Sequence, residues 1–325
     1  MNNTQIQTTT SQITFANRWE HLLTRLAVNR MGHRVAPGLY KLGQPTSDSP
    51  VFVSANYTLS FDALRSALVG KDAYLLVLDT KGINVWCAAG KGTFGTAELI
   101  NRIRLTELDQ VVNHHTLILP QLGAPGVCSY EVKRETGFEV EFGPIRATDL
   151  PQYMKTHKAT AEMRQVKFNL LDRLILVPVE FVGILLPLLA ASIVIYFLGG
   201  WLNVFWLIAA CLAGTVLLPI LLPWLPTRDF SSKGLILGFL ISTPFVAAQL
   251  ARIDQSWFSN LLRALPKILI FPAVTAFITL NFTGSTTFTS RTGVRREIYK
   301  YIPVMAWMAG IGLLITIIQL FGFLS

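Results

Sequence analysis

The sequence predicts an α/β domain over residues 1–168, followed by an all-α transmembrane domain of about five helices over residues 169–325. In the first part, segments typical of strands alternate with segments typical of helices, among many charges and turn residues. In the second part, apolar stretches recur that are long enough to cross a hydrocarbon core of roughly 30 Å. The mean hydropathy of +0.46 therefore averages two parts that face different solvents.

The α/β domain is predicted from a succession of short elements. Residues 51–57 are rich in β-branched and aromatic side chains, which predicts a strand, and residues 59–68 have helical periodicity with Thr58 or Ser60 available as a cap. Strands are also predicted over residues 73–80, 83–88, 115–120 and 138–145, and helices from residue 90 and near residues 133–137. This alternation favours a mostly parallel sheet, although the two strands around Lys81-Gly82 could form a hairpin.

Five membrane spans are predicted, each near the roughly 17–25 residues that a helix needs. They are Leu174–Leu198, Trp201–Trp224, Gly234–Leu250, Ala264–Phe282 and Tyr301–Leu324. Basic residues precede the first span and fill the loops after the second and fourth, which places these loops and the α/β domain in the cytoplasm and the C-terminus outside. The N-terminus lacks a basic segment followed by an apolar one, so we expect no cleaved signal.

Few charged groups lie within the spans, and their simplest interpretation is structural. Glu180 falls only about 9 Å of helix rise beyond Leu174, so we expect it near the cytoplasmic interface with Arg173 in reach. Lys267 would lie at the opposite face, and no relay of ionisable groups runs between them. The Ser/Thr-rich loop over residues 284–293 suits helix caps and turns, with docking of the α/β domain as the alternative.

The charge and the cysteines exclude several functions. The net charge is +9, but the α/β domain has no cluster of Lys and Arg, so we expect no nucleic-acid partner. Much of the excess positive charge borders the membrane spans, where we expect lipid to be its partner. Cys87, Cys128 and Cys211 lie far apart, without the paired spacing of a zinc or iron–sulfur site. Electrons, if they are needed, must come from another protein.

The segment from Asn84 to Gly92 concentrates the chemistry. Cys87 is predicted at the end of a strand, before a Gly-rich turn and a helix N-terminus, where free N–H groups and the helix dipole favour a thiolate. A thiolate can serve as a nucleophile or as a metal ligand. The alternative is a small buried hydrophobe, which is also the interpretation for Cys128.

A glycine pattern overlaps this segment. Residues 90–95 read Gly-Lys-Gly-Thr-Phe-Gly, and Asp109 follows at a distance that suits a ribose-binding acid. The helix that begins here carries on to about Arg104, however, so Asp109 would not end a following strand as a dinucleotide site requires. A dinucleotide site is therefore the less favoured interpretation of this pattern.

Residues 84–91, Asn-Val-Trp-Cys-Ala-Ala-Gly-Lys, resemble the signature of the HgcA family, the corrinoid proteins of the mercury-methylating pair. Four further stretches are similar to the corrinoid-binding domain of the corrinoid iron–sulfur protein large subunit. They are residues 37–43, 49–65, 119–127 and 137–150. The resemblance implies a Rossmann-like corrinoid-binding domain joined to a multi-span membrane domain.

The resemblance also implies a site and partners. Cys87 would be the lower axial ligand of cobalt in a cobalamin-like corrinoid, and a methyl group would pass from cobalt to Hg(II). An upstream methyl donor or methyltransferase and a ferredoxin-like protein with two 4Fe–4S clusters would be the partners. Further cofactor-binding residues would be Asn84, Val85, Trp86, Ala88, Ala89, Gly90, Lys91, Gly92, Thr58 and Ser60. Small residues here could equally serve close packing alone, and Lys91 could be a solvated surface residue.

Three other functions stay open from the sequence. A membrane-tethered corrinoid methyl carrier of one-carbon metabolism keeps the cofactor and changes the methyl acceptor. A nicotinamide-dependent membrane oxidoreductase would use the glycine pattern. A channel or transporter would use the α/β domain for regulation.

Overall fold

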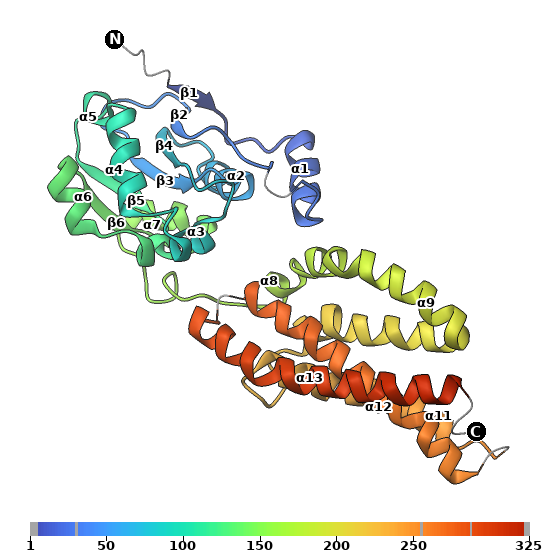
Figure 1. Cartoon of the computed structure of the whole chain (residues 1–325). Helices are drawn as coiled ribbons and strands as arrows, with labels where there is room; N and C mark the ends of the chain where they lie inside the picture. The colour runs from blue at the N-terminus through green and yellow to red at the C-terminus, as the bar shows by residue number, and fades with distance from the viewer. Residues whose placement is uncertain (1–5, 30–31, 254–255, 287, 322–325) are drawn as a thin grey trace. The chain divides into compact units, whose positions relative to one another are not determined.

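A computed structural model describes residues 6–29, 32–253, 256–286 and 288–321. The chain divides into two compact units, Met1–Lys167 and Phe168–Ser325. The first is an α/β unit and the second is helical (Figure 1).

The α/β unit is built on a six-stranded sheet with the order β1-β2-β4-β3-β5-β6. The strands are β1 (Gln7–Thr9), β2 (Gly38–Leu42), β3 (Val51–Ala55), β4 (Ala73–Leu78), β5 (Thr116–Leu119) and β6 (Glu139–Phe142). Strand β2 runs antiparallel to β4, and the other neighbouring pairs are parallel. The prediction of a mostly parallel sheet is therefore confirmed.

Helices cover both faces of this sheet. They are α1 (Phe15–Arg25), α2 (Thr58–Ala67), α3 (Val85–Lys91), α4 (Thr96–Leu105), α5 (Leu108–Val111), α6 (Ser129–Thr136) and α7 (Leu150–Thr156), with 3-10 turns η1 (Gln121–Gly126) and η2 (Ala147–Asp149). Side chains alternate along β4: Leu76 and Leu78 pack with α3, α4 and α6, whereas Leu75 and Val77 pack with α2 and α7. Both faces are apolar because both are buried.

Two local predictions in this unit are wrong. Residues 83–88 do not form a strand, because Asn84 caps helix α3 and the chain is helical from Val85. No hairpin therefore forms around Lys81-Gly82, and β4 pairs in parallel with β3. Neither Thr58 nor Ser60 caps α2; its N-cap is Tyr57, which makes no side-chain capping bond.

Four helical stretches of the second unit are long and apolar enough to cross a membrane: Leu170–Leu221, Phe230–Leu250, Trp257–Gly284 and Thr292–Leu320. They comprise α8 (Leu170–Leu174), α9 (Val177–Leu212), the π-helical turn η3 (Ala213–Leu217), α10 (Leu218–Leu221), α11 (Phe230–Leu250), α12 (Trp257–Asn281), the 3-10 turn η4 (Phe282–Gly284) and α13 (Arg291–Leu320). The count is four rather than the five expected, because the first two predicted spans form one stretch.

That first stretch holds 52 residues, more than twice what one crossing needs. It is interrupted at Gly200, whose φ of +73° and ψ of −176° are not helical. The chain turns back on itself there (Figure 1), so that Leu188 before the break shares a buried cluster with Trp206 and Leu207 after it. The break separates the two predicted spans, which end at Leu198 and begin at Trp201.

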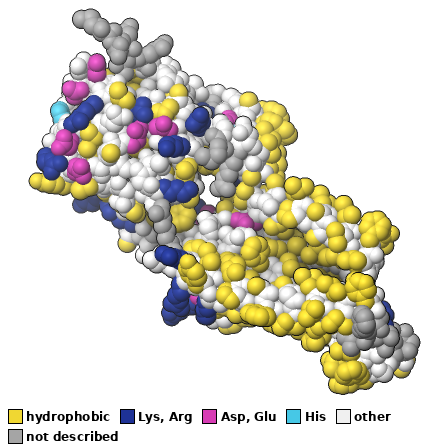
Figure 2. Space-filling view, viewed as in Figure 1, with side chains coloured by type: hydrophobic (Ala, Val, Ile, Leu, Met, Phe, Trp, Pro, Cys, Tyr) yellow, Lys and Arg dark blue, Asp and Glu magenta, His cyan; other side chains and the backbone are white. Residues whose placement is uncertain are grey.

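The surface of the helical unit is apolar. Figure 2 shows hydrophobic side chains over most of its visible surface, whereas charged side chains gather on the α/β unit. Large side chains such as Leu186, Phe197 and Trp307 are exposed, which suits lipid as the surrounding solvent.

Several polar side chains within the helical unit have partners there. Glu180 accepts a hydrogen bond from the Ser285 hydroxyl. Lys267 Nζ donates to Gln249 at 3.2 Å and lies 4.1 Å from the centre of the Trp206 ring. Ser290 caps α13 by accepting from the Gly293 N–H at 3.1 Å, which agrees with the capping interpretation of this loop.

Candidate functional site

A polar network at the carboxyl ends of β3 and β4 fixes where α3 starts. Asn56, buried directly after β3, accepts hydrogen bonds at Oδ1 from the backbone N–H groups of Thr80 (3.1 Å) and Gly82 (3.0 Å). Its side-chain nitrogen donates to Asp79 Oδ1 at 3.2 Å. Gly82 has a φ of +72°, which costs a glycine little, so the turn from β4 into α3 is tight.

Asn84 begins α3 and holds its first turn. The backbone is extended at this residue, and its side-chain Oδ1 accepts a hydrogen bond from the Cys87 N–H at 2.9 Å. This bond satisfies one of the N–H groups that every helix start leaves without an intrahelical partner. Cys87 lies in the first turn of a helix, so the prediction that it ends a strand is wrong.

Helix α3 has an inward and an outward side. The inward residues, which join the core of the sheet, are Val85, Ala88 and Ala89. At 100° per residue, Cys87 and Lys91 point to the other side, with Gly90 beside them. Cys87 is half-buried, whereas Gly90 and Lys91 are exposed. We call these three residues the outward face of α3; it is the side of the helix from which a ligand can approach.

The inward side of α3 fits tightly against η1. A Cβ atom on Gly126 would lie only 2.1 Å from the Phe94 carbonyl oxygen and 3.0 Å from the Ala89 Cα. One on Gly95 would lie 2.8 Å from the Gly92 carbonyl oxygen. Backbone therefore packs on backbone here, and the small size of Ala88 and Ala89 serves this contact with the core.

The other predicted site residues lie around this helix or away from it. Trp86 is half-buried in the first turn, and Gly92 ends the helix with a φ of +83°. Thr58 and Ser60 belong to α2, which packs on the opposite face of the sheet from α3. The buried Thr58 hydroxyl already donates to Glu20 Oε1 at 3.1 Å. Residues 84–92 thus lie together around α3, while Thr58 and Ser60 lie in the first turn of α2, which follows the parallel neighbour β3 at the same edge of the sheet.

The donor set at α3 limits the kind of metal that Cys87 can bind. Within the described residues, no group of three or more His, Cys, Asp or Glu side chains could hold a metal ion. A metal bound by Cys87 would therefore take most of its ligands from elsewhere. A thiol suits a metal whose other positions are filled by a macrocycle.

The glycine pattern of residues 90–95 lies between two helices. Gly90 is in α3, Gly92 follows its last turn, and Gly95 precedes α4. A dinucleotide site needs the pattern directly after a strand, whereas β4 already ends at Leu78. Asp109 lies in the short helix α5 and not at a strand end, as expected. This geometry does not support nicotinamide binding.

A separate cavity lies at the amino ends of the strands. Its volume is about 670 Å³, and its lining includes Asp48, His114, Glu139 and Tyr153. Asp48 and His114 precede β3 and β5, so the cavity is at the opposite edge of the sheet from α3. Burial, helped by the charge of Glu141, raises the pKa of the Tyr153 phenol to about 12, so this hydroxyl stays protonated at neutral pH.

Sequence reasoning missed Asn56, Thr80 and Gly126, which position α3. A usable signal was present for the first two, because polar residues at the carboxyl ends of predicted parallel strands meet at one sheet edge. Gly126 carried no such signal, since its close contacts come from segments distant in sequence.

Comparison with known proteins shows what the α/β unit is similar to. The family described as CO dehydrogenase/acetyl-CoA synthase delta subunit matches residues 26–154. The acetyl-CoA decarbonylase/synthase complex subunit gamma of Methanopyrus kandleri is 31% identical over 128 residues, which is 39% of this chain and 27% of that protein. The subunit of the same name from Methanothermobacter thermautotrophicus is 32% identical over 127 residues, 38% of this chain and 27% of that protein.

A bacterial relative carries a more explicit name. The corrinoid/iron–sulfur protein large subunit of Moorella thermoacetica is 29% identical over 129 residues, 39% of this chain and 28% of that protein. The chain thus spans about a quarter of the length of the curated relatives that it matches. The likeness covers most of the α/β unit, including α3 and the strands that position it.

Proposed function

We propose that the α/β unit binds a cobalt corrinoid with Cys87 as the lower axial ligand, and that the protein transfers a methyl group from this cobalt to Hg(II). The observation that carries the proposal is the outward face of α3, which presents one thiol, next to an exposed glycine, at the carboxyl edge of an α/β sheet. The relatives that match this unit support the cofactor, since one of them is named a corrinoid protein. The resemblance of residues 84–91 to the HgcA signature supports the acceptor.

The residues around Cys87 would bind and orient the ring rather than react. Asn84 holds the first turn and so fixes the direction of the Cys87 side chain. Gly90 has no side chain, and a Cβ there would meet nothing within 4 Å, so a flat ring could approach α3 closely. Lys91, exposed one turn after Cys87, could donate to an amide of the corrin or pair with a carboxylate of a partner protein.

A bound corrinoid would supply a cobalt centre able to carry a methyl group, and a strongly donating thiolate ligand such as that of Cys87 would favour transfer of this group to a soft electrophile such as Hg(II). The task of the chain is to hold Cys87 in the right place. The first turn of α3 contributes to this, because its cap fixes the backbone at Cys87.

The second candidate function keeps the cofactor and changes the acceptor. A membrane-tethered methyl carrier of one-carbon metabolism is favoured by the names of the relatives, which are subunits of acetyl-CoA complexes. A methyl-transfer assay separates the two functions. Membranes containing the protein should methylate Hg(II), and repeated turnover should need a ferredoxin-like protein with 4Fe–4S clusters or a low-potential reductant. Methyl transfer to another acceptor, with none to Hg(II), would favour the second function.

Cys87→Ala tests the ligand directly. We expect this variant to insert in membranes as the wild type does, to change the visible spectrum of the bound corrinoid and to lose methyl transfer. Cys87→His should bind cobalt with much reduced transfer, because imidazole is a neutral and weaker donor than thiolate.

Cys128→Ala is the matched control. The interpretation of Cys128 as a small buried residue is wrong, because it is exposed, directly before α6 of the same unit. Its replacement should change neither the spectrum nor the rate. A Cys87→Ala protein that keeps both the wild-type spectrum and the wild-type rate would show that Cys87 is not the ligand.

A further inference from the structure

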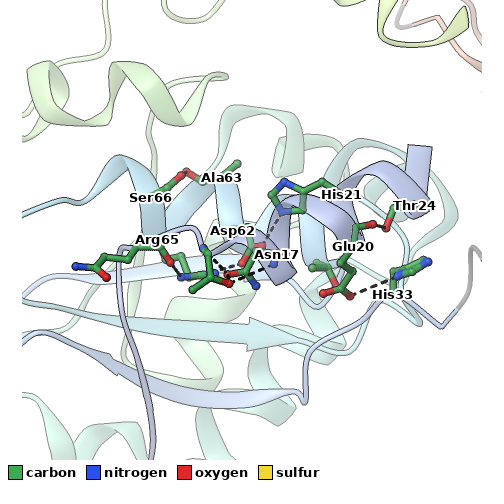
Figure 3. A network of polar contacts seen from close by, with 12 residues as sticks. Asn17, Glu20, His21, Thr24, His33, Asp62, Ala63, Arg65 and Ser66 are labelled. Atoms are coloured by element: carbon green, nitrogen blue, oxygen red, sulfur yellow. Dashed lines mark hydrogen bonds and ion pairs between the residues drawn. The ribbon is translucent and has the colours of Figure 1, made fainter. Parts of the chain in front are cut away.

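Helix α1 is attached to the α/β unit by its polar side. Glu20 accepts from the Thr58 hydroxyl at 3.1 Å, and His21 Nε2 lies 2.6 Å from Asp62 Oδ2 (Figure 3). Thr24, one turn further along the helix, is buried. Amphipathic helices of globular proteins normally turn their apolar side to the core, so this orientation is inverted.

The network that holds α1 in this orientation is itself buried. Asp62 is 3% exposed and receives a second contact from Arg65 Nε at 2.6 Å. Arg65, 5% exposed, also donates to the carbonyl oxygens of Thr10 and Gln12, at 2.6 Å each, in the segment that leads into α1. Buried charged groups with several partners define one arrangement, so the inverted orientation is fixed by the fold.

The opposite side of α1 is apolar and faces out. Phe15 is 82% exposed, Trp19 54% and Leu22 45%, and their spacing of four and three residues places them on one stripe. Arg18 and Arg25 are exposed on one flank of this stripe. Glu20 is the one acidic residue of α1, all of whose residues are described, and it is on the docked side.

We propose that this stripe of Phe15, Trp19 and Leu22 inserts into the surface of an anionic lipid bilayer. Aromatic and leucine side chains bordered by arginine are what helices that lie in the membrane interface present to lipid. Arg18 and Arg25 complement the charge of anionic headgroups. The stripe is on a convex single helix, which suits a soft lipid surface.

The covalent connection to the helical unit makes such a surface available. Residues 157–169 connect α7 to α8, and an extended chain of this length reaches roughly 45 Å. The connector carries three basic residues, Lys158, Arg164 and Lys167, and one acidic residue, Glu162. The α/β unit is therefore held close to the bilayer that the apolar helices occupy, and weak insertion by three side chains suffices at this effective concentration.

The test is photo-crosslinking in the full chain, in nanodiscs of roughly seven parts phosphatidylcholine to three of phosphatidylglycerol. Trp19 or Phe15 is replaced by benzoylphenylalanine, an aromatic for an aromatic at an exposed position, and adducts are identified by mass. The control position is Tyr130, 73% exposed on α6 of the same unit. Lipid adducts at Trp19 and Phe15 should exceed those at Tyr130 by about fivefold or more. They should fall when Arg18→Glu and Arg25→Glu are combined, or when the disc contains only phosphatidylcholine.

Each alternative occupant of the stripe gives a different product. Adducts from Trp19 to peptides of the helical unit or of a second copy would show a protein contact and overturn the proposal. Lipid adducts that are no more frequent than at Tyr130 would overturn it as well. The readout requires neither corrinoid nor mercury, so its failure is distinguishable from failure of the proposed function.

Discussion

Replacing Asn84 by alanine should loosen α3 without touching Cys87. The helix has seven residues, fewer than the roughly 12–15 that an isolated helix needs to be stable in water. Its stability therefore rests on its cap and on the packing of Val85, Ala88 and Ala89. Loss of a side-chain cap costs about 1 kcal/mol, which corresponds to an increase of about fivefold in the population of the opened helix.

Peptide-level hydrogen exchange over residues 84–92 measures this change. In Asn84→Ala the amides of α3, that of Cys87 above all, should exchange about fivefold faster, while β4 and α4 should not change. Corrinoid affinity should fall by no more than about the same factor, because only the folded fraction binds. Asn84→Ser is the control, since serine caps nearly as well and should keep near-wild-type exchange.

Two results would refute this reasoning. Unchanged exchange in Asn84→Ala would mean that the bond between Asn84 and Cys87 does not stabilise α3. Loss of the corrinoid spectrum in Asn84→Ser, with normal exchange, would mean that the amide contacts the cofactor itself and is more than a cap.

Three further predictions concern other parts of the molecule. Asp62→Ala removes the carboxylate beside buried Arg65 and should lower the free energy of unfolding of the α/β unit in urea by about 3–5 kcal/mol. The control is Glu135→Ala, which breaks an exposed pair with Arg104 and should change this free energy little. Equal effects of the two variants would contradict the assigned burial. Because the chain turns back at Gly200, the four helical stretches make five crossings. A tag after Ser325 should therefore be accessible from outside the cytoplasmic membrane, and a tag before Met1 should not. Protection of both tags would mean an even number of crossings. Purified protein should contain no stoichiometric iron or acid-labile sulfide, since Cys87, Cys128 and Cys211 are separate, and full iron–sulfur loading would contradict this.

The sequence predicted those parts of the fold that depend on the surrounding solvent and on the periodicity of apolar residues. Long apolar runs located the membrane-crossing stretches, and the break between Leu198 and Trp201 could be placed because two glycines follow a run that is already long enough. Strands β3, β4 and β5 were predicted because central strands buried on both faces are uniformly apolar.

The sequence misled where local propensity opposed tertiary structure. The β-branched and aromatic side chains of residues 83–86 favour a strand, yet Asn84 starts a helix there, because Val85, Ala88 and Ala89 recur at helical spacing and fit against η1. Helix α1 was not predicted either. Its orientation depends on contacts with Asp62 and Thr58, about forty residues away, which no local pattern reveals.

The residues that determine the position of α3 differ from Cys87, the residue on α3 that would carry the chemistry. The inward residues, the Asn84 cap and the close approach of Gly126 determine where the helix lies, and none of them needs a cysteine at position 87. Cys87 is half-buried, and its backbone N–H bond to Asn84 does not depend on the side chain, so its replacement by alanine should cost little stability. A loss of methyl transfer in Cys87→Ala therefore reports the chemistry of the thiol, while a loss in Gly126→Ala, where the added Cβ would push against Phe94 and Ala89, reports the position of the helix. Comparing the corrinoid spectra of these two variants distinguishes a missing ligand from a displaced one.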